Sequence, residues 1–157
     1  MVWRESLLDL YKKTFDLHHW TITSRCIDYW EELEETQWWS PEKMQTYQFE
    51  KLKKIITHAY DNVDYYKDTF DSSGFKPSDF SSFEDLQLLP LLDKETVKED
   101  PLKLVPQNIN LQSDEIVEIA TSGSTGIPLR MYAERKQLEY RYAAVLRNWG
   151  WLGWKFG

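Results

Sequence analysis

Hydrophobic residues recur every three to four positions over much of the chain, a pattern that is typical of amphipathic helices. The helices predicted from this pattern cover residues 5–19, 27–37, 41–60, 64–72 and 134–148, with short helical turns over 82–90 and 93–98. Residues 101–113 show neither helical nor strand periodicity and are predicted to be irregular. The first half of the chain is therefore expected to be mainly helical.

Capping residues support the limits of these helices. Ser40-Pro41-Glu42 combines an N-cap side chain, a proline suited to the first turn and an acidic residue at the positive end of the helix dipole. Gly74 is expected to end the helix over 64–72, and Gly150 the helix over 134–148. The side chains predicted to face the core are Ile27, Trp30 and Leu33; Met44, Tyr47, Leu52, Ile55, Ile56 and Ala59; Tyr65, Tyr66 and Phe70; and Leu138, Tyr142, Val145, Leu146 and Trp149.

Two short segments instead alternate with a period of two. Strands are predicted over residues 115–120 (EIVEIA) and 129–133 (LRMYA). In the second strand, Leu129 and Met131 lie on one face and Arg130 and Tyr132 on the other. The predicted fold class is α/β, or α+β for these residues: a helix-rich first half followed by a strand, a loop, a strand and a helix.

The loop between the strands, TSGSTGIP over 121–128, carries the candidate chemistry. Gly123 and Gly126 permit close backbone approach, and consecutive backbone N–H groups in such a turn can surround an anion. Hydroxyl donors come from Thr121, Ser122, Ser124 and Thr125. The segment lacks the Gly-Lys-Ser/Thr ending of a Walker A loop and the three glycines of a dinucleotide fingerprint. From spacing alone, a polar hairpin turn without a ligand explains it equally well.

The amino-acid composition argues against several kinds of partner and site. The 157 residues have a net charge of −7, which argues against nucleic acid and anionic membranes as partners. No segment is apolar enough for a transmembrane helix, and the charged N-terminus does not resemble a signal peptide, so we expect a cytoplasmic protein. The single cysteine, Cys26, is interpreted as a buried structural thiol, and no metal-ligand spacing is present.

TSGSTGIP resembles the phosphate-binding motif of the adenylate-forming superfamily. Two upstream segments, HAYDNVDYYKDTF and FEDLQLLPLLDKETV, resemble the N-terminal helical region of the phenylacetate–CoA ligase family, and the resemblance extends from about Trp30 to the C-terminus. The N-terminal extension and the WGWLGW segment resemble the branch found in capsular polysaccharide gene clusters. The chain departs from the common pattern at Leu129, where many superfamily members have lysine, and at Asp64, where family members commonly have proline.

The resemblance implies a helical region over 1–113 and the start of an AMP-binding α/β subdomain over 114–157. It implies that ATP, Mg²⁺, a carboxylic acid and CoA are used by the intact enzyme, with no catalytic residue assignable in this chain. It assigns ATP phosphate binding to Thr121, Ser122, Gly123, Ser124, Thr125 and Gly126. We expect an N-terminal fragment that is inactive alone and that can self-associate through its incomplete sheet. The alternative is a non-catalytic helical interaction module with a degenerate nucleotide loop.

Overall fold

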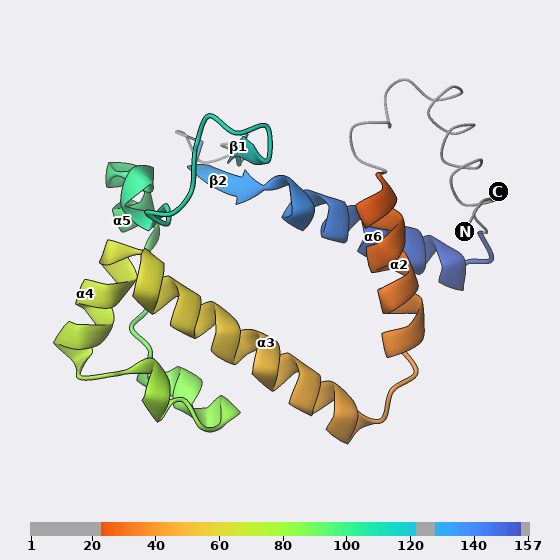
Figure 1. Cartoon of the computed structure of the whole chain (residues 1–157), viewed down its shortest axis with the longest axis horizontal. Helices are drawn as coiled ribbons and strands as arrows, with labels where there is room; N and C mark the ends of the chain where they lie inside the picture. The colour runs from red at the N-terminus through yellow and green to blue at the C-terminus, as the bar shows by residue number, and fades with distance from the viewer. Residues whose placement is uncertain (1–22, 122–127, 155–157) are drawn as a thin grey trace. The chain divides into compact units, whose positions relative to one another are not determined.

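The computed structural model describes residues 23–121 and 128–154, which form an α+β structure with one two-stranded antiparallel sheet (Figure 1). The α-helices are α2 (Ser24–Thr36), α3 (Pro41–Asn62), α4 (Asp64–Ser73), α5 (Lys94–Glu99) and α6 (Arg135–Trp151). The 3-10 helices are η1 (Pro77–Asp79), η2 (Phe83–Leu88) and η3 (Pro101–Leu104), and the strands are β1 (Ile116–Ala120) and β2 (Arg130–Glu134). The helix predicted over 5–19 lies outside the described residues.

The chain divides into two compact units. The first comprises Met1–Trp39 and Ala133–Gly157, and the second is the continuous segment Ser40–Tyr132. Within the first unit, α2 packs against α6. The buried residues of this contact are Cys26, Leu33, Ala143 and Leu146, with Tyr29, Trp30 and Ala144 partly buried around them.

Helix α2 begins three residues before its predicted start because Thr23 caps it. The Thr23 hydroxyl accepts a hydrogen bond from the Cys26 backbone N–H at 3.3 Å. The sequence prediction placed Ile27, Trp30 and Leu33 on the inner face. Ile27 and Leu33 are buried and Trp30 is partly buried, so the predicted face of this helix is confirmed.

The predicted inner face of α6 is wrong in part. Tyr142, Val145 and Trp149 are exposed, whereas Glu139, Ala143 and Leu146 are buried. These three lie four and three positions apart and so share one side of the helix. The physical reason is that the small side chain of Ala143 permits a close approach to α2, and Glu139 finds polar partners on α2 that a local hydrophobic pattern does not reveal.

The end of α6 also differs from the prediction, because Gly150 lies inside the helix and Gly153 follows its end. Gly153 has a φ of 87°, and its N–H donates to the Gly150 carbonyl while the Trp154 N–H donates to the Trp149 carbonyl. This pair of bonds is a Schellman motif. The rings of Trp149 and Trp154 meet edge to face, with centroids 5.9 Å apart, and provide the apolar contact that accompanies such an end.

The second unit has its own core, formed where α3 and α4 meet the segment that follows them. Its buried residues are Ile56, Phe70, Phe75 and Phe80, surrounded by Phe49, Leu52, Tyr60, Tyr66 and Leu89. Ile55, predicted to face the core, is 65% exposed, so that prediction is wrong. Its neighbour Ile56 occupies the core instead, because consecutive helical positions point about 100° apart.

Side-chain caps support the helices of the second unit, and the predicted cap at Ser40 is confirmed. Ser40 accepts a hydrogen bond from the Lys43 N–H, and Asp93 accepts one from the Thr96 N–H. Asp85 accepts from the backbone N–H groups of Ser81 and Ser82, which supports η2. The stretch predicted to be irregular from 101 begins with η3 instead, where the Asp100 carboxylate accepts from the Leu102 N–H.

Candidate functional site

The candidate site is the hairpin formed by β1 and β2 (Figure 1). The predicted strands are confirmed to within one residue at each end. In β2 the exposed side chains are Arg130 and Tyr132, while Met131 is partly exposed and Ala133 is buried. This alternation confirms the predicted faces of the second strand, and it brings the two ends of the 121–128 segment together.

Thr121 and Leu129 make two hydrogen bonds at the base of this segment. The Thr121 backbone N–H donates to the Leu129 carbonyl at 3.0 Å. In return, the Leu129 backbone N–H donates to Thr121 Oγ1, also at 3.0 Å. Thr121 therefore has a structural role that the motif alone did not indicate: its hydroxyl oxygen binds the backbone on the opposite side of the hairpin.

The other residues assigned to phosphate binding, Ser122, Gly123, Ser124, Thr125 and Gly126, lie outside the described residues. Their role stays a prediction. The structure describes where the segment leaves β1, at Ala120 and Thr121, and where it returns, at Pro128 and Leu129. Thr121 is exposed, as is Pro128, so solvent reaches both ends of the segment.

Arg130 follows the position at which many adenylate-forming enzymes carry lysine. Its Nη1 lies 2.8 Å from Glu118 Oε1 on the paired strand. Both side chains are exposed, so water screens this pair and it contributes little to stability. Its geometric effect is to hold the Arg130 guanidinium beside the stem of the hairpin.

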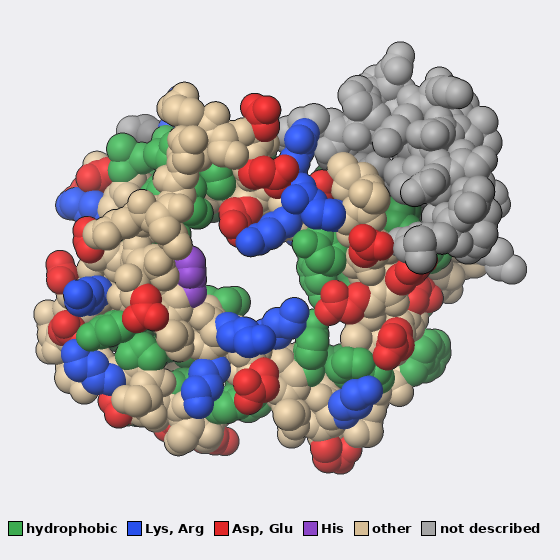
Figure 2. Space-filling view, viewed as in Figure 1, with side chains coloured by type: hydrophobic (Ala, Val, Ile, Leu, Met, Phe, Trp, Pro, Cys, Tyr) green, Lys and Arg blue, Asp and Glu red, His purple; other side chains and the backbone are tan. Residues whose placement is uncertain are grey.

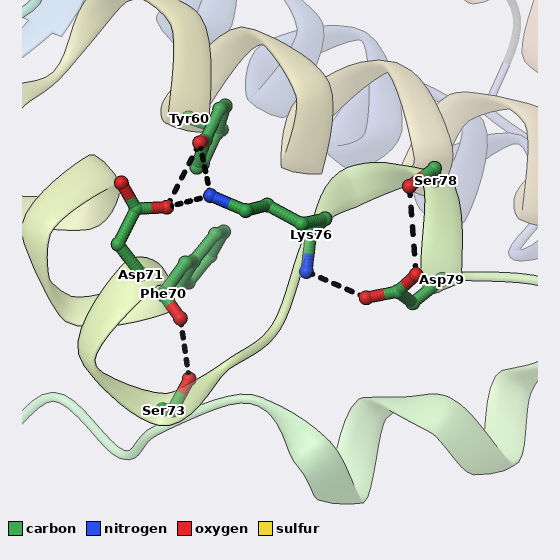
Figure 3. A network of polar contacts seen from close by, with 7 residues as sticks. All are labelled: Tyr60, Phe70, Asp71, Ser73, Lys76, Ser78 and Asp79. Atoms are coloured by element: carbon green, nitrogen blue, oxygen red, sulfur yellow. Dashed lines mark hydrogen bonds and ion pairs between the residues drawn. The ribbon is translucent and has the colours of Figure 1, made fainter.

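A second cluster of titratable groups lies in the second unit, where the Lys76 ammonium meets the Asp71 carboxylate and the Tyr60 hydroxyl (Figure 3). The Tyr60 hydroxyl donates to Asp71 Oδ1 at 2.8 Å. Hydrogen bonds from Lys76 and Tyr60 lower the pKa of Asp71, and those to Asp71 and Tyr60 raise the pKa of Lys76 to about 12. These groups bind one another across the α3–α4 core, and we interpret the cluster as structural.

Glu139 is the buried charge of the first unit, and sequence reasoning missed it. Its side chain is 1% exposed, and its carboxylate accepts from Arg25 Nε at 2.7 Å and from the Thr23 hydroxyl at 2.8 Å. Burial, and then the charge of Glu139, raise the pKa of the neighbouring Cys26 thiol to about 12. The predicted burial of the Cys26 thiol is confirmed.

Several kinds of site are absent from residues 23–121 and 128–154. No helix there has the length and apolar character needed to cross a membrane. No three His, Cys, Asp or Glu side chains there are grouped in a way that could hold a metal ion. Basic and acidic side chains are interspersed on the face shown in Figure 2. We therefore keep the hairpin that carries the 121–128 segment as the candidate site.

The chain is similar in sequence to several known enzymes. The chain is 33% identical over 91 residues to the phenylacetate-coenzyme A ligase of Escherichia coli K12, an overlap of 57% of this chain and 20% of the ligase. It is 32% identical over 113 residues to the enzyme of that name from Aromatoleum evansii, an overlap of 69% and 24%. The Thermus thermophilus enzyme is 29% identical over 111 residues, an overlap of 68% and 24%.

The overlap spans between a fifth and a quarter of the length of these curated relatives. No protein-family model matches the chain. The chain is similar to phenylacetate-coenzyme A ligases from four different organisms. These similarities support the phenylacetate-CoA ligase family as the one to which the chain is related.

Proposed function

We propose that the chain is the N-terminal part of an ATP-dependent ligase that activates a carboxylic acid as an acyl-adenylate and then transfers the acyl group to CoA. The observation that carries this proposal is the similarity to phenylacetate-CoA ligases, in a chain whose TSGSTGIP segment connects two paired strands. In the first step the carboxylate attacks the α-phosphorus of ATP and pyrophosphate leaves. In the second, the CoA sulfur displaces AMP from the acyl group.

The first step sets the chemical requirement for the loop. Negative charge accumulates on the departing pyrophosphate, and donors already held in place stabilise that charge most effectively. The proposed donors are the backbone N–H groups and hydroxyls over residues 121–126. The hydrogen-bonded stem between Thr121 and Leu129 supports this proposal because it fixes both ends of the segment.

Mg²⁺ is proposed to enter bound to ATP. The described residues offer no group of three ligating side chains, so we assign no step of the reaction to metal ligands of this chain. The acid substrate is proposed only as a carboxylic acid. Phenylacetate is part of the names of the relatives.

The finer parts of the assignment are also proposals. They are the division into a helical region over 1–113 and the start of an AMP-binding subdomain over 114–157, the capsular-polysaccharide branch, a cytoplasmic location and self-association through the sheet. Because the overlap spans at most 24% of the relatives, we propose that these 157 residues do not catalyse adenylation by themselves.

Two measurements test the proposed function. The purified chain should bind MgATP through the loop, and it should show no exchange of pyrophosphate into ATP that depends on a carboxylic acid. Acid-dependent exchange would show that the chain is active alone. Absence of ATP binding in the folded chain would favour the non-catalytic interaction module.

A further inference from the structure

Large apolar side chains lie together at one end of the first unit, where α2 and α6 both finish. The rings of Trp149 and Trp154 contact each other, and Trp151 and Leu152 lie between them in the sequence. The Trp151 indole N–H donates to Gln37 Oε1 at 2.7 Å, which holds the end of α2 at the same place. Together with the residue that follows Gln37, these side chains form the aromatic tip: Trp38, Trp149, Trp151, Leu152 and Trp154.

The aromatic tip is exposed to solvent. Leu152 is 86% exposed and Trp38 is 81% exposed, while the other three members are between 39% and 64% exposed. The indole N–H of Trp151 is already bonded to Gln37, so this residue exposes mainly its apolar ring. A group of exposed apolar side chains usually marks a surface that contacts a partner protein or a membrane.

The composition of the aromatic tip favours a membrane over a protein partner. Four of its five residues are tryptophan, and none is isoleucine or valine. Tryptophan is enriched where a protein meets the interfacial region of a bilayer, because its ring is mainly apolar and its N–H is polar. A surface that docks a helix of another protein is instead usually built from leucine, isoleucine and valine.

Charged groups of both signs border the aromatic tip. The Arg147 guanidinium lies over the Trp151 ring, 5.0 Å from its centroid. On the α2 side, the Glu34 carboxylate accepts a hydrogen bond from Gln37 Nε2 at 3.2 Å. A zwitterionic phospholipid headgroup carries a phosphate that suits an arginine and an ammonium that suits a carboxylate or an aromatic ring. The net charge of −7 disfavours an anionic lipid surface.

We propose that the aromatic tip inserts into the interfacial region of a bilayer of zwitterionic phospholipid, so that the chain binds a membrane surface without crossing it. The rings and Leu152 contact the boundary between headgroups and acyl chains, and Arg147 lies at the depth of the phosphates. This inference goes beyond the proposed function and does not depend on it, because the hairpin takes no part in the contact.

The test measures how the 157-residue chain partitions onto phosphatidylcholine vesicles. Trp38→Ala/Leu152→Ala removes the two most exposed side chains of the aromatic tip, where little packing is lost. Its partition coefficient should be about tenfold lower than that of the wild-type chain, or lower still, because insertion strength follows the apolar area that enters the bilayer. Brominated phosphatidylcholine should quench the tryptophan fluorescence of the bound wild-type chain, because the tip tryptophans lie within the bilayer.

A matched control comes from the second unit. Leu88→Ala/Leu91→Ala also removes two exposed apolar side chains, 57% and 96% exposed, but leaves the aromatic tip intact. Its partition coefficient should stay within about twofold of the wild-type value. Vesicles that also contain phosphatidylglycerol should bind the wild-type chain more weakly, because the chain and the lipid are then both negatively charged.

Several outcomes would overturn the proposal. They are no vesicle binding by a wild-type chain that circular dichroism shows to be folded, equal losses in the two double variants, and unchanged binding in Trp38→Ala/Leu152→Ala. Binding without quenching would show that the tip stays outside the bilayer. Stronger binding to phosphatidylglycerol would contradict the zwitterionic lipid. A wild-type dimer in sedimentation velocity that Trp38→Ala/Leu152→Ala converts to a monomer would assign the tip to a second copy of the chain instead.

Discussion

Arg25 Nε lies 2.7 Å from Glu139 Oε2, and this ion pair joins α2 to α6 across 114 positions of sequence. The two partners differ in exposure: the Glu139 side chain is 1% exposed and that of Arg25 is 43% exposed. The Glu139 carboxylate is almost completely shielded from water, so the groups that replace water around it must stabilise its charge. Those groups are Arg25 and the hydroxyl of the helix cap Thr23.

Loss of Arg25 should therefore destabilise the first unit. Arg25→Ala leaves a buried carboxylate without its charged partner, and we expect the free energy of unfolding to fall by about 2 kcal/mol, less than for a fully buried pair because Arg25 is partly exposed. Every tryptophan of the chain lies within 1–39 or 133–157, so tryptophan fluorescence during urea unfolding reports on this unit.

Lys136→Ala is the matched control for this experiment. Lys136 pairs with Glu134 at 2.8 Å in the same unit, but both side chains are exposed. Its removal should change the free energy of unfolding by less than about 1 kcal/mol. Equal losses in Arg25→Ala and Lys136→Ala would contradict the importance of burial at Glu139.

The Cys26 thiol should react slowly while the first unit is folded. Its pKa is raised from 9.0 to about 12, which lowers the thiolate population at neutral pH by about a thousandfold, and its side chain is buried. Modification by a disulfide reagent should be slow in buffer and rapid in denaturing urea. Equal rates under the two conditions would show that the thiol is accessible in the folded chain.

The same shift predicts how stability depends on alkaline pH. Folding raises the pKa of this thiol, so the folded state favours the protonated form. The stability that comes from this preference is fully present below pH 9 and is lost as the pH rises toward 12. Cys26→Ala should show a weaker decline in stability above pH 9 than the wild-type chain, measured by urea unfolding at several pH values.

Replacement by alanine should lower the free energy of unfolding at Gly74 and raise it at Gly150. Gly74 follows α4 with a φ of 75° and no atom within 4 Å of an added Cβ, so Gly74→Ala should cost about 1 kcal/mol from backbone strain alone. Gly150 lies within α6, where an added Cβ would meet Glu34 Oε1 at an ordinary 3.7 Å. Gly150→Ala should stabilise the first unit by up to about 1 kcal/mol.

Gly74→Asn provides the control, because asparagine tolerates the left-handed region better than alanine. It should lose less stability than Gly74→Ala in thermal unfolding followed by circular dichroism. The two glycines are thus distinguished by backbone conformation, although the sequence pattern assigned both of them to helix ends. A stabilising Gly74→Ala would contradict the left-handed conformation after α4.

Asp71 should titrate below its ordinary pKa of 3.8 because Lys76 and Tyr60 donate hydrogen bonds to its carboxylate. Folding lowers this pKa, so the associated stability is present above pH 3.8 and is lost as the pH falls through the folded-state value. In an NMR titration, Lys76→Met should raise the pKa of Asp71 toward 3.8. An unchanged Asp71 pKa in that variant would contradict the cluster drawn in Figure 3.

Local sequence signals predicted the elements well. The Ser40 side chain caps a helix only three residues away, and the alternation around Arg130 involves only neighbouring positions. Both features could therefore be predicted from short stretches of sequence. Glu139 could not be identified in this way. A glutamate on a helix usually faces solvent, and its partner Arg25 is far away in the sequence.

The candidate site was predictable only in part. Its strands and its small, hydroxylated residues are evident in the sequence, but the bond between Thr121 Oγ1 and the Leu129 N–H depends on the register of the two strands. The buried face of α6 could not be predicted from local sequence either. Helical periodicity predicted that Tyr142 and Val145 face the core, whereas the contact with α2 buries the adjacent face, which carries Glu139 and Ala143.

The proposed function depends on ATP binding by the loop, and calorimetry with MgATP measures it. The comparison is between the wild-type chain, Ser124→Ala/Thr125→Ala, and the control Thr57→Ala/Ser72→Ala, which changes two exposed residues outside the hairpin. We predict that the wild-type and control chains bind ATP and that the loop variant binds at least about tenfold more weakly, because hydrogen bonds to charged phosphate are lost. Equal affinity in all three chains, or no binding by a chain that circular dichroism shows to be folded, would contradict the proposal.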